Sequence, residues 1–185
     1  MKRNSHLYKM VVTALLLAVG LYLPFLLGQT EVLGQTISPL HIPALLCGLT
    51  CGWGWGAVLG AVMPVMRSLL FGMPPMPAAI PMAFELAVYG AVTGLLYPLF
   101  VRLLRKANHL PAMLVSMIAA MILGRMAGGA AKAVMMGFQG NAYTFQTFIA
   151  AYFTGTAVGA VIHLIAVPAV ALALEKSGLS AVKAD

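Results

Sequence analysis

Charged side chains are scarce in this sequence. Only 8% of its 185 residues are charged and just four are acidic, whereas about a quarter of a typical soluble domain is charged. Hydrophobic residues make up 62% of the chain. A soluble core could not hide that much apolar surface, so the composition excludes a soluble domain and predicts an integral membrane protein. The net charge of +7 does not indicate nucleic-acid binding, because most basic residues flank apolar runs, where they set topology.

The sequence also lacks the motifs of ATP hydrolysis and of common hydrolases. No glycine-rich loop ends in Gly-Lys-Ser or Gly-Lys-Thr, so any energy that the protein uses has to come from an ion gradient or a partner. The motifs Gly-x-Ser-x-Gly and His-Glu-x-x-His are absent as well. The sequence therefore predicts neither an enzyme nor a cofactor in this chain.

Cysteine and histidine are too few to predict a metal site. Two thiols are insufficient without neighbouring histidines, so Cys47 and Cys51 are interpreted as small apolar side chains. His41 and His163 lie in apolar surroundings, where a lone histidine is more often a hydrogen-bonding packing residue than a catalytic one.

Apolar runs dominate what is present, and a membrane span needs about 20 such residues. They predict an all-α membrane protein, a compact six-helix transmembrane bundle that forms one domain over residues 1–185. The first run follows Met1-Lys2-Arg3, but no small-x-small cleavage site closes it, so we interpret it as a retained helix. The second run spans only if it tilts or borrows flanking residues. Pro81 is expected in the first turn of the fourth helix. The expected helices are about 7–28, 40–51, 54–71, 80–104, 110–136 and 143–175.

Lysine and arginine are unequally distributed between the loops. The loops at 28–39, 71–79 and 137–143 contain neither residue. Six helices place both termini on the opposite, basic side, which the positive-inside rule makes cytoplasmic. The basic residues on that side are Lys2, Arg3, Lys9, Arg102, Arg105, Lys106, Lys176 and Lys183.

Four ionisable residues lie inside predicted helices, in the external half of the bundle: Arg67, Glu85, Arg125 and Lys132. A charge near the bilayer centre is costly, so it usually has a partner or a function. One interpretation is structural: Glu85 pairs with Arg67 or Arg125, and the remaining cations snorkel. The other is an outward-facing pocket whose summed charge of +2 suits a carboxylate or phosphate. On either reading, Glu85 is expected about one turn inside its helix.

The external loops add hydrogen-bonding side chains suited to a polar small molecule. They supply Gln139, Asn141, Tyr143 and Gln146 as candidate binding residues, together with Gln29 and Gln35. Proline-rich and glycine-rich turns in the same loops could form a lid over such a site.

Small residues recur at four-residue spacing, which allows helix backbones to approach closely. The pairs and triplets are Ala14 and Ala18; Gly52, Gly56 and Gly60; Gly124 and Gly128; Gly155 and Gly159. Most of these are expected to form contacts within the bundle.

Several stretches resemble the substrate-binding S components of energy-coupling factor (ECF) vitamin transporters. They are SPLHIPALLCG, MPVMRSLLFGMPPMP and IPMAFELAVYGAVTGLLY, within a similarity that covers about residues 8–170. The resemblance implies a multi-pass protein of a prokaryotic cell membrane that binds a water-soluble vitamin on its external side. It also implies partners, namely a transmembrane coupling protein and two cytosolic ATP-binding subunits, which use ATP in place of this chain. Ala14 and Ala18 match the Ala-x-x-x-Ala pattern that contacts the coupling protein in the family.

The vitamin itself is less well defined. Pantothenate, with one carboxylate, suits a cationic outer pocket best, and cobalamin, folate, riboflavin and hydroxymethylpyrimidine are the alternatives. The competing function is a stand-alone secondary transporter or channel for a small anionic solute. That function would predict an inverted repeat between the two halves, and none is evident in the sequence.

Overall fold

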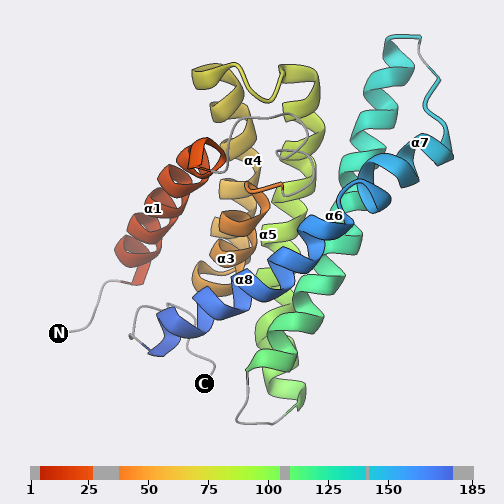
Figure 1. Ribbon diagram of the computed structural model, residues 1–185. Coiled ribbons are helices and arrows are strands. Elements are labelled where there is room, and N and C mark those ends of the chain that lie inside the picture. Colours follow the sequence, from red (N-terminus) through yellow and green to blue (C-terminus); the bar gives the residue numbers. More distant parts are fainter. Residues whose placement is uncertain (1–4, 27–37, 105–108, 141, 177–185) are drawn as a thin grey trace.

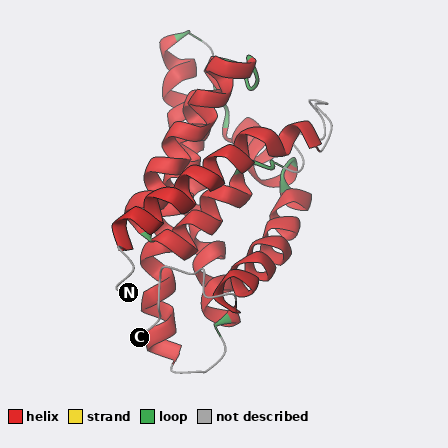
Figure 2. Ribbon diagram, turned by 90° about the vertical axis from the view of Figure 1, so that its left-hand side faces the viewer, coloured by secondary structure: helices red, strands yellow, loops and turns green. Residues whose placement is uncertain are grey.

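The computed structural model describes residues 5–26, 38–104, 109–140 and 142–176, and every element within them is helical (Figure 2). In chain order these are α1 (Ser5–Leu26), α3 (His41–Cys51), α4 (Trp53–Phe71), α5 (Met76–Leu104), α6 (Leu110–Phe138), α7 (Phe145–Ile149), the π-helix η1 (Ala150–Thr154) and α8 (Ala157–Lys176).

Five helical segments in the described part of the chain are long and apolar enough to cross a membrane. They are α1, α4, α5, α6 and the combined segment Phe145–Lys176, whereas α3 is a shorter apolar helix. The all-helical prediction is therefore confirmed. Helix α5 begins at Met76, four residues before the predicted start, because Pro77 rather than Pro81 occupies its first turn. Pro81 lies inside the helix, so its placement at the helix start was wrong.

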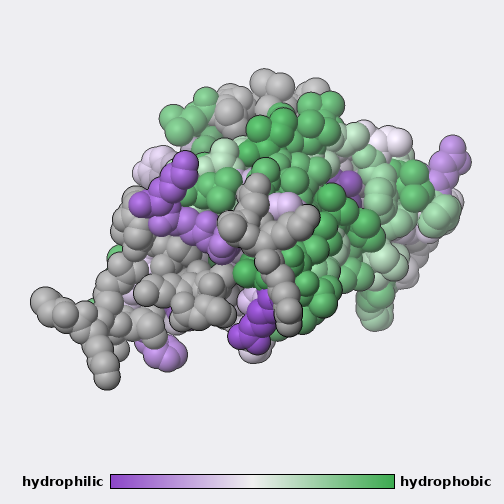
Figure 3. All heavy atoms as spheres, turned by 90° about the horizontal axis from the view of Figure 1, so that it is seen from below, coloured by the Kyte–Doolittle hydropathy of each residue, from purple (hydrophilic) through white to green (hydrophobic). Residues whose placement is uncertain are grey.

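The helices run alternately up and down, so the described ends of α1 and α8 lie at the same end of the molecule (Figure 1). The α4–α5 connection and the outer end of α6 lie at the opposite end. Viewed from the end that holds Ser5 and Lys176, the described residues present apolar surface together with separate hydrophilic side chains (Figure 3). Arg102 and Lys176 lie in the last turns of α5 and α8 at this end.

Helix α3 forms the centre of the bundle. Ten of its 11 residues are buried, and it contacts α1, α4, α5 and α8. At 1.5 Å per residue it is about 16 Å long, roughly half of the hydrocarbon thickness. A helix that is apolar on all sides packs best where protein surrounds it. Helix α3 alone does not span, and its first residue, His41, is buried within the bundle.

Glycines bring α4 and α5 into backbone contact. A Cβ atom on Gly56 would lie 2.7 Å from the Gly90 carbonyl oxygen. A Cβ on Gly60 would overlap the backbone of Leu86. These contacts confirm the packing role predicted for Gly56 and Gly60. Gly52 has open space at its own Cβ position and a φ of 94° that makes the turn between α3 and α4, while its backbone lies close to Gly94 of α5.

Candidate functional site

Glu85 is the centre of a buried polar group in the middle of the bundle. Its exposed fraction is 7%. One carboxylate oxygen, Oε1, lies 3.3 Å from Nε2 of His41 and accepts a hydrogen bond from the Tyr89 hydroxyl at 3.1 Å. The other ring nitrogen of His41, Nδ1, lies 2.9 Å from the Ser38 carbonyl oxygen. The carboxylate is therefore joined to the start of α3 and to the next turn of its own helix.

Tyr89 extends this group to α6. Its hydroxyl accepts a hydrogen bond from Nε of Arg125 at 3.3 Å while it donates to Glu85. The predicted pairing of Glu85 with Arg125 is thus indirect, because one phenol lies between the two charges. Three helices, α3, α5 and α6, contribute to a continuous chain of His41, Glu85, Tyr89 and Arg125. Such pairing offsets the cost of burying the charges in an apolar interior.

Aromatic rings surround both ends of the chain. The His163 ring from α8 stacks on His41 with centroids 5.4 Å apart. The Phe153 ring lies 5.5 Å from the guanidinium carbon of Arg125, within the range of a cation–π contact. Tyr152, the preceding residue of η1, lies near Gly128, where a Cβ atom would be 3.2 Å from its ring. The last transmembrane segment therefore closes one side of the group.

Arg67 lies in a different environment. Its side chain donates to the Leu21 carbonyl oxygen in α1. Its guanidinium carbon lies 4.9 Å from the Phe25 ring centre and 5.7 Å from that of Phe71. Because these contacts join α4 to α1, the predicted Arg67–Glu85 ion pair is not formed. The ligand contact predicted for Arg67 has no support from this position.

Lys132 lies on the same face of α6 as Arg125, nearer to the external end of the helix. The two residues are seven apart, which is close to two helical turns, so they share one face of the helix. Lys132 is half-buried, whereas Gln139, which follows the last turn of α6, is exposed. Within the described residues, no hydrogen bond joins either side chain to Glu85 or Arg125. Their ligand contacts remain predictions.

The remaining predicted contacts lie beyond α6. Gln146 is exposed in α7, and Asn141 lies outside the described residues. The Tyr143 hydroxyl is enclosed and has no hydrogen-bond partner among the described residues. Burial raises the pKa of this phenol, so it remains a neutral donor.

Sequence reasoning missed Tyr89, and it interpreted His41 and His163 as hydrogen-bonding packing residues without connecting either of them to Glu85. The spacing in FELAVYG places Tyr89 one turn after Glu85, and this i, i+4 relation could have identified it. His41 is separated from Glu85 by 44 residues, and no spacing rule connects them. Their contact arises from the position of α3 at the centre of the bundle.

Ala14 and Ala18 lie on the outer face of α1, and both are exposed. The opposite face of the helix carries Thr13 and Gly20, which are buried; a Cβ on Gly20 would meet Met63 of α4. The two alanines therefore do not form contacts within the bundle, and the small surface between them is open to a partner.

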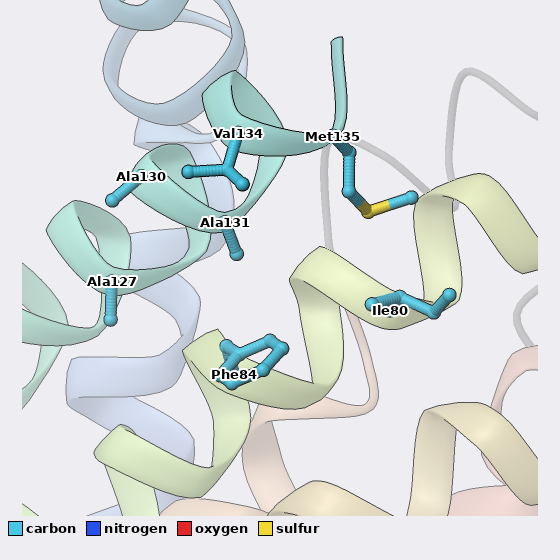
Figure 4. Close-up of a pocket in the computed structure, with 7 residues that line it drawn as sticks. All are labelled: Ile80, Phe84, Ala127, Ala130, Ala131, Val134 and Met135. Atoms are coloured by element: carbon cyan, nitrogen blue, oxygen red, sulfur yellow. The ribbon is translucent and has the colours of Figure 1, made fainter. Parts of the chain in front are cut away.

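An apolar groove lies between α5 and α6 on the outside of the bundle (Figure 4). Its volume is about 380 Å³. Figure 4 shows only apolar side chains around it, so this groove has no group that could recognise a polar ligand. It is separate from the Glu85 group, the hydrogen-bonded chain of His41, Glu85, Tyr89 and Arg125. The lining residues are Ile80, Phe84, Ala127, Ala130, Ala131, Val134 and Met135.

Comparison with known proteins gives one finding. No curated protein and no solved structure matched the chain. A family model described as "ECF transporter, substrate-specific component" matches residues 8–174. That match covers nearly the whole bundle, including every helix that contributes to the Glu85 group. The chain therefore belongs to the family of substrate-specific components of ECF transporters.

Proposed function

We propose that this chain is the high-affinity binding subunit for uptake of a water-soluble vitamin or vitamin precursor. The family consists of transport proteins that act with an ECF coupling module, and the apolar helices make this member a multi-pass protein of the cell membrane. The observation that carries the proposal is the buried chain of His41, Glu85, Tyr89 and Arg125. Ionisable side chains inside a membrane bundle commonly mark a binding site or a transport pathway.

The proposed site lies on the external side of this chain of residues, between α5, α6 and η1. Glu85 is nine residues after the start of α5, or about 14 Å along the helix axis. This is deeper than the single turn expected from the sequence, because α5 begins earlier. A ligand would descend past Lys132, Gln139, Tyr143 and Gln146 before it reaches Arg125. The positive-inside rule, with both termini cytoplasmic, makes this opening extracellular.

Pantothenate is the favoured ligand within this proposal. It carries a single carboxylate, which matches one buried arginine with a second cation, Lys132, on the same face of α6. Large planar vitamins usually stack on aromatic side chains. The two tryptophans, Trp53 and Trp55, lie in the first turn of α4, at the end of the bundle opposite the proposed opening, and the rings beside the proposed site are the smaller ones of Tyr152 and Phe153.

Calorimetry on the purified protein in detergent tests the proposed function. The probes are pantothenate, folate, riboflavin, cobalamin and hydroxymethylpyrimidine, without ATP. We expect one of them to bind at one site per chain, because the substrate-specific component binds before the ATP-using subunits act. If correctly folded protein binds none of these five vitamins, the proposal is contradicted.

A further inference from the structure

We infer that Arg125 and Glu85 recognise two different groups of the same ligand, so that the ligand is an acid that also carries a hydroxyl, amine or amide donor. Arg125 would bind the acidic group, and Glu85 would accept the hydrogen bond from the donor. This inference rests on the proposed function and specifies the chemical class of its substrate.

Arg125 retains unused donors. The side chain is only 9% exposed, yet its single hydrogen bond with a described residue runs from Nε to Tyr89. The two terminal nitrogens donate to none of the described residues, and neither is among the fully enclosed atoms. A guanidinium presents these nitrogens as a planar fork that matches a carboxylate or phosphate. Because these donors are unpaired among the described residues and are not fully enclosed, an anionic partner can reach them.

Glu85 retains an unused acceptor. His41 and Tyr89 both contact the same oxygen, Oε1. The second oxygen, Oε2, accepts no hydrogen bond from the part of the chain that the structure describes, and it is not fully enclosed. It lies 3.3 Å from the position that a Cβ atom on Gly128 would take. A side chain at this position would collide with Glu85 and the Tyr152 ring, so the glycine allows α6 to pack close to the free oxygen.

The π-helix η1 places two consecutive aromatic residues beside these two charged groups. Tyr152 lies beside Gly128 and Glu85, whereas Phe153 lies over Arg125. A π-helical turn is wider than an α-helical one, and such turns occur frequently at functional sites. The two rings thus cover the unused acceptor and the unused donors from the same helix. This arrangement is independent of the charges and indicates the same location.

The pair of opposite charges restricts the ligand. A neutral ligand would leave the terminal nitrogens of Arg125 without an anionic acceptor. A ligand without a hydrogen-bond donor would place only its own acceptors against the Glu85 carboxylate. A molecule with an acidic group at one end and hydroxyl or amide donors along its length satisfies both residues. Pantothenate is such a molecule, and pantothenol, its neutral alcohol, is a matched probe that lacks only the acidic group.

The test measures the affinity of pantothenate and pantothenol, alongside the other vitamins, for wild-type protein and for Arg125→Gln, Arg125→Lys and Glu85→Gln. We expect Arg125→Gln to weaken binding of the acidic probe by about 10-fold to 100-fold, because a charged hydrogen bond is lost. Pantothenol binding should change little, since it has no acidic group for Arg125. Arg125→Lys should restore part of the loss, and Glu85→Gln should weaken both probes.

Two matched substitutions serve as controls. Arg102→Gln removes an exposed arginine from the last turn of α5. Glu175→Gln removes a carboxylate that also contacts a tyrosine and a histidine, Tyr97 and His109, at the other end of the bundle. Both should bind the probes like wild type. Thermal unfolding and gel filtration of every variant establish that the bundle is intact.

The outcomes separate the inference from the proposed function. If no vitamin binds to folded wild-type protein, both fail. If wild type binds riboflavin, hydroxymethylpyrimidine, cobalamin or pantothenol as tightly as any acid, the proposed function stands and the inference is overturned. Unchanged affinity of the acidic probe in folded Arg125→Gln would overturn it as well.

Discussion

At the scale of single residues, the two buried arginines show that the same side chain can have different roles in one bundle. Arg67 is 4% exposed and Arg125 is 9% exposed, so burial does not distinguish them. Their contacts do, because Arg67 binds a backbone carbonyl and two rings at the α1–α4 contact. Arg125 contacts a tyrosine that is itself bound to Glu85. We therefore propose that Arg67 contributes to stability and that Arg125 binds the ligand.

Arg67→Gln should destabilise the protein without weakening ligand binding. Glutamine cannot reproduce the contact with the Leu21 carbonyl together with both ring contacts, so the loss should be about 1–3 kcal/mol. Thermal unfolding in detergent measures the change in stability, and calorimetry measures the affinity. We expect the affinity to stay within about twofold. A tenfold loss of affinity with unchanged stability would instead place Arg67 at the ligand.

At the scale of secondary-structure elements, the long helices could be predicted from the sequence because apolar length is a strong signal. The predicted starts of α3 and α4 differ from the observed ones by one residue, and the last residues agree. The role of α3 could not be predicted in the same way. Its apolar composition fits either a lipid-facing or a fully buried helix, and only packing against four neighbours identifies it as the core. The contacts of His41 follow from the packing of α3, so the sequence could predict neither the packing nor these contacts.

We propose that helix α1 presents the surface that contacts the coupling protein. Ala14 and Ala18 are exposed, and neither fills space inside the bundle. Ala14→Trp or Ala18→Trp should therefore block vitamin uptake by the complete transporter, because a large ring prevents close approach of the coupling protein. Ligand binding by the isolated chain should be unchanged.

Separating partner binding from ligand binding requires two measurements on Ala14→Trp and Ala18→Trp. Uptake by cells or proteoliposomes that contain the coupling module reports the partner contact, and calorimetry on the purified chain reports the site. Thr13→Trp is the matched control, since Thr13 is buried on the inner face of α1 and its replacement should lower stability. Equal loss of uptake and binding in Ala14→Trp would assign that alanine to packing.

At the scale of the whole molecule, the proposed ligand site and the proposed partner surface lie in different parts of the bundle. The Glu85 group lies inside the bundle between α3, α5 and α6, whereas the exposed alanines lie on the outer face of α1. Family membership requires both a substrate and a coupling module, and this separation lets each bind without displacing the other. The sequence predicted the presence of intramembrane charges, but not their network, because Glu85 is joined to residues from distant segments.

The most direct test of this account is mass spectrometry of the small molecule released from the purified protein. Wild-type chain, isolated in mild detergent from cells grown in vitamin-containing medium, should release one water-soluble acid with hydroxyl or amide donors, close to one per chain. Folded Arg125→Gln, purified in parallel, should release much less of it, and Arg102→Gln should match wild type. Release of no vitamin from folded wild-type protein, or equal amounts from wild type and Arg125→Gln, would contradict the account.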